Sequence, residues 1–220
     1  KLINNPKDAR EIIGLALTRL LLERDGALHD GVLIPVDSHT DLFAEHKRQL
    51  QDVDIRLHRN DLILARVRHG RLSLQLIEVK FRSGSGSPAE EVALKEAIVI
   101  KNADTQKVLE ARFVPQAEAD RLDREIQNKQ LANLLQFYLD RCRRHGLIDA
   151  HIADSADIQT VIRAVTEGNF EVEFERAGFI YNLQGTSKQP EQYKENRIHV
   201  VGNDTIRELL DIPADVEAPP

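Results

Sequence analysis

The feature that most constrains this chain is a pair of β-rich runs joined by a very short link. Residues 62–67 and 72–77 are rich in branched apolar side chains, and His69 and Gly70 lie in the link between them. A glycine in so short a link between two such runs is typical of a β-hairpin. The sequence therefore predicts two adjacent antiparallel strands at this point.

The length of the link decides which residues face each other across the hairpin. If the tip has two residues, Arg68 pairs with Arg71. The pairing then continues outward until Asp61 lies opposite Glu78. Directly opposed side chains point to the same face of a sheet, with Cβ atoms about 4.5–5.5 Å apart. A loop with an odd number of residues would shift the register by one and separate the two acids.

Two carboxylates held this close repel each other, and a bound cation relieves the repulsion. Lys80 follows Glu78 by two residues, so its side chain projects from the same face of the strand. Apolar residues on both faces of this strand indicate that it is central, where charged side chains are costly unless they are used. The hairpin therefore predicts a divalent-metal site that contains Asp61, Glu78 and Lys80.

This arrangement resembles the PD-(D/E)XK phosphodiesterase superfamily. The resemblance rests on Asn60-Asp61, where asparagine stands in place of the motif's proline, and on Glu78-Val79-Lys80 at the end of the next strand. It implies three catalytic residues, Asp61, Glu78 and Lys80. The two acids, together with the backbone carbonyl of Val79, would bind Mg²⁺ or Mn²⁺. The lysine would contact the attacking water or the scissile phosphate.

Many members of that superfamily carry a further acid on the first helix. Glu11 and Glu23 are both candidates here, and the sequence does not choose between them. Asp37, His39 and Asp41 offer another cluster of metal-ligating side chains if the chain is extended there. The same run is better suited to a turn that begins a helix, because its serine, threonine and aspartate side chains cap backbone N–H groups.

The remaining pattern predicts helices around these strands. Helices are expected at residues 8–24, 40–51, 88–113, 117–145 and 158–167, and further strands at 32–36, 170–183 and 198–201. The first helix should be largely buried, because apolar residues cover most of its circumference. The predicted fold class is α/β, a central mixed sheet flanked by helices. The resemblance implies a restriction-endonuclease-like core with a helical insertion.

One nuclease-like domain is expected over residues 1–212. Its core would comprise about 6–113 and 170–201, with the helical insertion at about 117–167. Residues 213–220 are acidic and proline-rich, and they are expected to link to another part of the protein. Residues 33–39 and the proline-rich exit also resemble nuclease-like regions of large bacterial phage-defence DNA translocases. That resemblance implies an ATPase or translocase domain in the same protein.

The charge and the cysteine content of the chain exclude several other classes of protein. A net charge of −6 argues against a protein that coats nucleic acid, although residues 46–82 carry a local charge of +5 that suits phosphate contacts. The single cysteine, Cys142, excludes a disulfide framework and a cysteine-rich zinc site. Without an apolar run of membrane-spanning length, a cytoplasmic protein without membrane partners is expected. Several arginines of the basic stretch should border the cleft, among Arg56, Arg59, Arg66, Arg68, Arg71 and Arg82.

Two functions follow from these observations. The first is a metal-dependent endonuclease domain that hydrolyses DNA phosphodiester bonds, and the intact Asp61, Glu78 and Lys80 favour it. The second is a non-catalytic nuclease-like module that binds DNA or docks a partner, and the overall acidity favours that one. The sequence leaves open DNA versus RNA, cleavage specificity and whether the chain forms a homo-oligomer.

Overall fold

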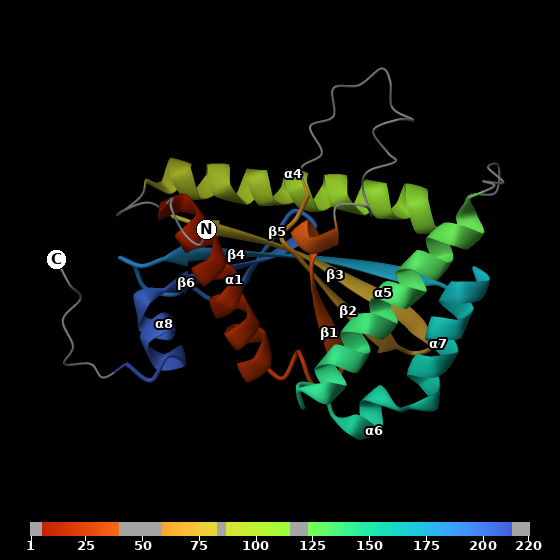
Figure 1. Ribbon diagram of the computed structural model, residues 1–220. Coiled ribbons are helices and arrows are strands. Elements are labelled where there is room, and N and C mark those ends of the chain that lie inside the picture. The colour runs from red at the N-terminus through yellow and green to blue at the C-terminus, as the bar shows by residue number, and fades with distance from the viewer. Residues whose placement is uncertain (1–5, 40–58, 83–86, 115–122, 213–220) are drawn as a thin grey trace, which may run out of the picture.

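A six-stranded mixed sheet with helices on both faces forms the centre of the molecule (Figure 1). The computed structural model describes residues 6–39, 59–82, 87–114 and 123–212. The strands are β1 (Gly31–Pro35), β2 (Leu62–Arg68), β3 (Arg71–Phe81), β4 (Val172–Asn182), β5 (Glu191–Tyr193) and β6 (Asn196–Gly202). The helices are α1 (Pro6–Arg24), the 3-10 helix η1 (Val36–His39), α4 (Pro88–Phe113), α5 (Arg124–Arg144), α6 (Ala150–Ala153), α7 (Ala156–Glu167) and α8 (Asn203–Leu209). The predicted α/β fold class is confirmed.

The predicted hairpin is present in the predicted register. β2 and β3 are antiparallel, and Leu62 pairs with Ile77. His69 and Gly70 form the tip, with positive φ angles of 52° and 76°. Two-residue turns with positive φ at both positions match the twist of the strands that they join. Local turn chemistry therefore sets the pairing along the whole hairpin.

The sheet order is β1-β2-β3-β4-β6-β5. β1 pairs antiparallel with β2 and is an edge strand, a position that tolerates the proline at its end. β4 pairs parallel with β3, and β6 pairs parallel with β4. The pairing of β3 with β4 continues to Phe81, whereas its pairing with β2 ends at Ile77, so the Glu-X-Lys run has a paired strand on one side.

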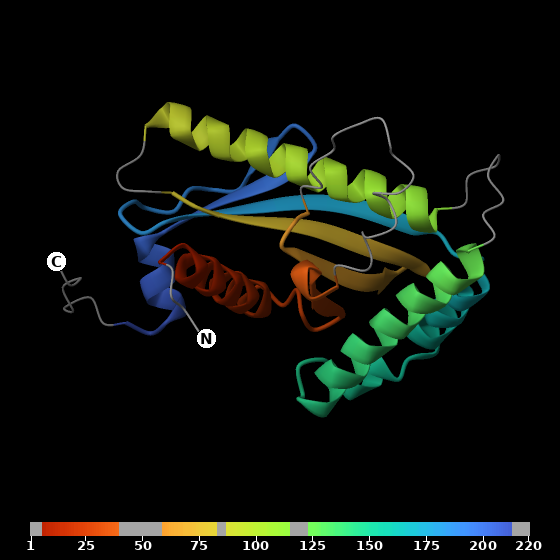
Figure 2. The ribbon, with the colours of Figure 1, turned by 45° about the horizontal axis from the view of Figure 1, so that its top comes forward.

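The two faces of the sheet bury different helices. Leu17 and Leu21 of α1 pack with Ile77 and Val79 on one face, together with Ile206 of α8. Helices α4, α5 and α7 contribute to the cluster that covers the alternate residues of β1, β2 and β3. Figure 2 shows α4 on the opposite side of the sheet from α1 and α8. Glu78 and Lys80 alternate with Ile77 and Val79, so they project toward α4.

Some predictions need correction. Ile12 and Ile13 are 50% and 51% exposed, so the expectation that the first helix is largely buried is wrong for its first half. The reason is that α1 covers the sheet with one side only. β5 and α8 were not predicted. The helix expected at residues 40–51 and the linker at 213–220 lie outside the described residues. No helix in the described part of the chain is long and apolar enough to span a membrane.

Candidate active site

Asp61 lies immediately before β2 and close to Glu78 of β3. Its backbone N–H donates to the Ile77 carbonyl at 3.1 Å, and its Oδ2 accepts a hydrogen bond from the Val79 N–H at 2.7 Å. These two contacts engage the residues on either side of Glu78. The Asp61 carbonyl accepts from the N–H of Val36 at 3.0 Å on the other side. Asp61 is therefore fixed between the edge strand and the central strand.

Asn60, at the place of the motif's proline, is a structural anchor for Asp61. Its side chain is buried and its Nδ2 donates to the Leu62 carbonyl at 2.6 Å. Its backbone N–H donates to Oγ1 of Thr105 on α4 at 2.9 Å. The asparagine thus ties the start of β2 to α4, which a proline without an N–H could not do.

Glu78 is fully buried, and two lysines converge on one of its oxygens. Lys101 Nζ of α4 lies 2.8 Å from Glu78 Oε1, and Lys80 Nζ pairs with the same oxygen. Glu78 Oε2 is buried and has no hydrogen-bond partner among the residues that the structure describes. The structure therefore brings Asp61, Glu78 and Lys80 together and adds Lys101 to them.

This environment perturbs the acid strongly. Burial, and then the charge of Asp61, raise the pKa of Glu78 to about 7, although Lys80 and Lys101 oppose the shift. Burial lowers the pKa of Lys101, but the charge and hydrogen bond of Glu78 outweigh that effect and raise it. Near neutral pH the lysine is charged while the glutamate is partly protonated. Added positive charge beside the glutamate would favour its ionised form.

A pocket of about 440 Å³ opens beside this cluster, between α1, α4 and the end of β3. Asp61, Lys80 and Lys101 line it, together with Arg10, Glu11, Val79 and Phe81. Of the two helix acids that the sequence left open, Glu11 therefore lies at the pocket. Glu23 is not in its lining and pairs with Arg19 at 3.5 Å instead.

Sequence reasoning missed Lys101 and Arg10 as site residues. The available signal was that Lys101 follows the apolar side of α4, three residues after the fully buried Ile98. A lysine on such a stripe indicates a buried partner, but the partner depends on how α4 crosses the sheet. That crossing joins residues far apart in the chain, and no local pattern encodes it.

The prediction that the arginines border the cleft is wrong for those that the structure describes. None of these lines the pocket, and Arg56 lies outside the described residues. Each of the described arginines forms an ion pair with a carboxylate instead. These ion pairs are Arg59–Asp37 (3.6 Å), Arg66–Asp30 (3.4 Å), Arg68–Glu175 (3.8 Å), Arg71–Glu171 (2.7 Å), Arg71–Glu173 (2.8 Å) and Arg82–Glu91 (3.0 Å). Arg68 and Arg71 are neutralised because β4, parallel to β3, brings its acidic first half beside the hairpin.

The run around His39 does not join the pocket. Asp37 and His39 belong to η1, which confirms a turn rather than an extended strand at this point. His39 Nε2 lies 2.8 Å from the hydroxyl of Tyr138 on α5. Asp41, the third member of the alternative cluster, lies outside the described residues.

The donor set fits a hard divalent cation. Glu78 Oε2 is a buried oxygen without a hydrogen-bond partner in the described ranges, and the charge of Asp61 acts on the same carboxyl group. No group of three or more His, Cys, Asp or Glu side chains suited to a metal occurs among residues 6–39, 59–82, 87–114 and 123–212. Mg²⁺ is commonly bound through one or two carboxylates while it keeps several waters and binds substrate phosphates. Two carboxylates beside an open pocket match that mode.

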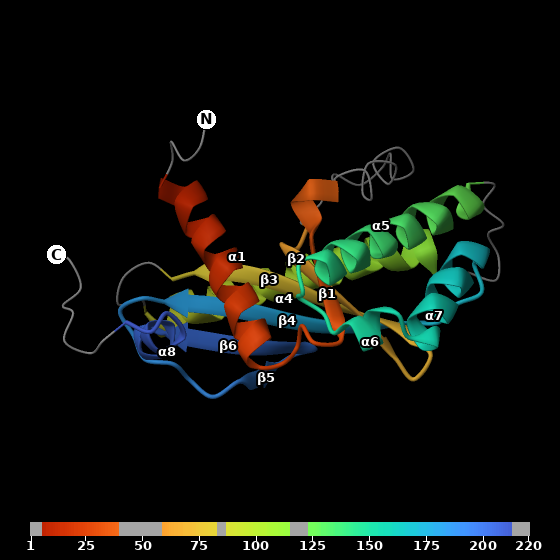
Figure 3. The same ribbon diagram turned by 60° about the horizontal axis from the view of Figure 1, so that its bottom comes forward.

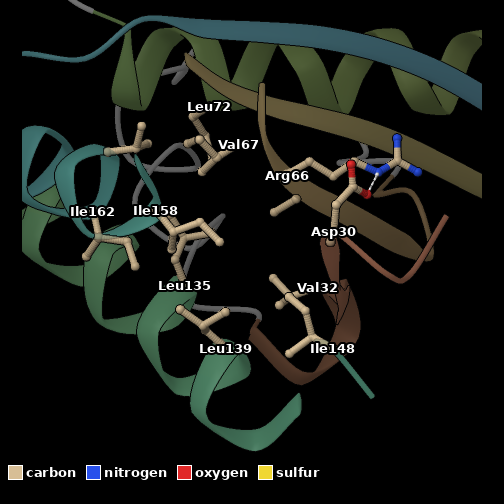
Figure 4. A pocket seen from close by; sticks show the side chains of 13 residues that line it. Asp30, Val32, Arg66, Val67, Leu72, Leu135, Leu139, Ile148, Ile158 and Ile162 are labelled. Atoms are coloured by element: carbon tan, nitrogen blue, oxygen red, sulfur yellow. Dashed lines mark ion pairs between the residues drawn. The ribbon is translucent and has the colours of Figure 1, made fainter. Parts of the chain in front are cut away.

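The molecule has another cavity that is unsuited to chemistry. It lies between β1–β3 and the helices α5 and α7, with mostly apolar walls that include Val32, Leu72 and Leu135 (Figure 4). Its volume of about 30 Å³ is close to that of one water molecule. The Arg66–Asp30 ion pair lies at its side. We regard it as a packing void.

Comparisons with protein-family models, with characterised proteins and with solved structures find no match to this chain.

Proposed function

We propose that this chain is a metal-dependent deoxyribonuclease domain in which Asp61, Glu78 and Lys80 are the catalytic residues. The observation that carries the proposal is Glu78, a fully buried carboxylate with one oxygen unpartnered among the described residues, close to Asp61, which lines a pocket. A strongly perturbed acid with a specific charged neighbour in a cleft is typical of functional sites.

The residues divide the work of phosphodiester hydrolysis. Asp61 and Glu78, with the Val79 carbonyl, would hold Mg²⁺ or Mn²⁺. When bound, the ion supplies a water of lowered pKa and offsets negative charge on the phosphate. Lys80 lines the same pocket and would hold the attacking water or the scissile phosphate. The water oxygen bonds to phosphorus while the bond from phosphorus to the leaving sugar oxygen breaks. The Lys80 ammonium would stabilise the negative charge that develops on the phosphate oxygens during this step.

The order of elements also supports the proposal. Helix α1, the antiparallel strands β1, β2 and β3, helix α4 and the parallel strand β4 follow one another as the resemblance to the PD-(D/E)XK superfamily implies. The proposal includes membership of that superfamily and DNA as the substrate. It also includes an ATPase or translocase domain in the same protein, a role in antiviral defence and a cytoplasmic location.

One observation favours the alternative, a non-catalytic module that binds DNA. Lys80 and Lys101 both pair with Glu78, and this closed arrangement leaves the glutamate without exposed surface. Such a cluster could be the remnant of a site whose lysines now serve only to bind phosphate. Binding without cleavage separates this function from the first.

The deciding experiment is a titration of Mg²⁺ and Mn²⁺ against a supercoiled plasmid. We expect nicking by the wild-type chain and a loss of at least about 10²–10³-fold in Asp61→Ala and Glu78→Ala, with nearly as large a loss in Lys80→Ala. Glu173→Ala, which removes a carboxylate paired with Arg71 away from the pocket, is the matched control and should cut normally. A parallel RNA substrate tests the substrate class.

Cleavage that persists in all three site variants would exclude the assigned residues. Salt-dependent DNA binding by a wild-type chain that does not cut with either metal would favour the non-catalytic module.

A further inference from the structure

A second large pocket, which shares no lining residue with the first, lies between α1, β1 and α5. Its volume is about 520 Å³, within the range of small-molecule sites. Figures 1 and 3 both show β1 between α1 and α5, so the edge strand forms the floor between two helical walls. Nothing in the proposed hydrolysis uses this pocket.

Three basic side chains line the pocket. Arg19 of α1 and Arg141 of α5 line it, with His145 just after α5, and the lining contains no carboxylate among the described residues. Arg19 makes a loose pair with Glu23 at 3.5 Å, in which both side chains are about half exposed. Such exposed pairs contribute little and release their partners readily.

Arg141 differs from the next arginine along α5. Arg143 pairs with Asp154 at 2.9 Å, whereas Arg141 makes no ion pair with any residue in the described ranges. Burial raises the pKa of the Cys142 thiol, and the charges of Arg141 and Arg19 oppose that shift. Two arginines from different helices therefore act on the same side chain, and all three of these residues line the pocket.

Much of the remaining lining is apolar. Leu28, Leu33 and Pro35 contribute to it, and Tyr138 adds a mostly buried ring. A small inorganic anion would contact the arginines and leave these apolar side chains in water. A ligand that contacts both kinds of lining residue needs an anionic group joined to an apolar surface.

We propose that this pocket binds a nucleotide, with its phosphate against Arg141 and Arg19 and its base against Leu33 and Pro35. Guanidinium groups bind phosphate through paired, charge-assisted hydrogen bonds. The face of the base supplies apolar surface to the leucine and proline side chains of the lining. A free nucleotide and a nucleotide within a DNA strand share this chemistry.

The single cysteine of the chain is a built-in reporter, because Cys142 lines the pocket and is partly exposed. The experiment measures the rate of Cys142 modification by a thiol reagent as deoxyadenosine monophosphate is added. We expect saturable protection, with an apparent affinity that falls about tenfold in Arg141→Ala. Arg143→Ala is the matched control from the same helix and should leave protection unchanged. Thermal melts verify that both variants fold.

The source of the nucleotide is decided by a short single-stranded oligodeoxynucleotide, used with Asp61→Ala so that the strand is not consumed. Stronger protection by the oligonucleotide assigns the pocket to a DNA strand, and protection by the monophosphate alone assigns it to a free nucleotide.

Three results would overturn the proposal: no protection by either ligand, equal protection by inorganic phosphate, or equal losses in Arg141→Ala and Arg143→Ala. A failure of plasmid cleavage with protection retained would refute the proposed hydrolysis and leave this pocket standing.

Discussion

Two charged clusters beside the end of β3 use the same residue types in opposite ways. In the first, Lys80 and Lys101 converge on Glu78. In the second, which we call the Glu91 network, three basic side chains lie within 3.0 Å of that glutamate, and these are Arg82 (3.0 Å), Lys95 (2.9 Å) and Lys188 (2.7 Å). Both glutamates are buried, so burial alone does not decide what each does.

The two carboxyl groups differ in whether their surroundings favour the ionised form. Burial opposes ionisation of Glu91, but hydrogen bonds from Lys188 and Lys95 outweigh it and lower the pKa to about 2. For Glu78, burial and the neighbouring Asp61 prevail over two lysines and raise the pKa to about 7. Surroundings that favour the ionised form stabilise the fold. Surroundings that disfavour it are typical of functional sites, which is why we assign function to Glu78 and not to Glu91.

The largest expected effect on stability comes from breaking the Glu91 network. Glu91→Gln leaves three basic side chains without their shared carboxylate, and removing one partner of a buried ion pair destabilises a protein by about 3 kcal/mol. Glu78→Gln should be neutral or stabilising near pH 8 without metal, because it removes a repelled charge. Urea unfolding of both variants measures the difference. Equal losses would mean that the two clusters are alike.

The pH dependence of stability should separate the clusters next. When a chelator keeps the protein free of metal, the pKa of Glu78 lies above its ordinary value of 4.5. The contribution of Glu78 to the unfolding free energy is therefore complete below pH 4.5 and is lost as the pH rises through about 7. This loss is at most about 3 kcal/mol, from the difference between the two pKa values. The pKa of Glu91 is lowered, so its contribution is instead lost as the pH falls from 4.5 through about 2.

Unfolding free energies measured across both windows test this sign difference. Glu78→Gln should remove the pH dependence of the unfolding free energy only between pH 4.5 and about 7. Glu91→Gln should remove it only between about pH 2 and 4.5. A neutral slope that survives in Glu78→Gln would assign it to another group.

Added metal should stabilise one cluster only. At one hundred times its dissociation constant a bound ion adds about 2.7 kcal/mol to the unfolding free energy. We expect Mg²⁺ or Mn²⁺ to raise the melting temperature of the wild type at pH 8. Asp61→Asn should lose this increase, while Glu91→Gln should keep it from a lower starting point. An equal increase in Asp61→Asn would place the ion elsewhere.

The smallest expected effect concerns Lys101, which we regard as a positioning residue that acts through Glu78. By holding Oε1 of Glu78, Lys101 would free Lys80 to reach the phosphate. Lys101→Met should lower the cleavage rate about tenfold, which is about 1.4 kcal/mol, less than the loss in Lys80→Met.

The pH profile of cleavage distinguishes this role from a structural one. Loss of the Lys101 charge should shift the acidic limb, which reports Glu78, toward higher pH, and Lys101→Arg should restore it. An unshifted limb in Lys101→Met would remove Lys101 from the site.

The parts of the site that local rules control could be predicted from the sequence. The short link with Gly70 predicted the hairpin, its register predicted that Asp61 and Glu78 lie close together, and the two-residue period placed Lys80 on the same face as Glu78. The contacts of Lys101 could not be predicted, because they depend on how α4 crosses the sheet. Likewise the acids that neutralise Arg68 and Arg71 arrive through a parallel strand about a hundred residues later in the chain.

The two-residue tip has a consequence for how this chain can vary in length. Asp61 lies eight residues from His69, a distance of about 26 Å along an extended strand. One residue inserted at the tip would lengthen the loop without moving the Glu-X-Lys run, because the pairing of β3 with β4 and the buried alternate side chains hold the register. One residue deleted within β3 between the tip and Glu78 would instead turn part of the strand to the opposite face. Functional relatives should therefore differ in length at this turn and not within the strand, and a single-residue deletion in β3 made far from the pocket should abolish activity.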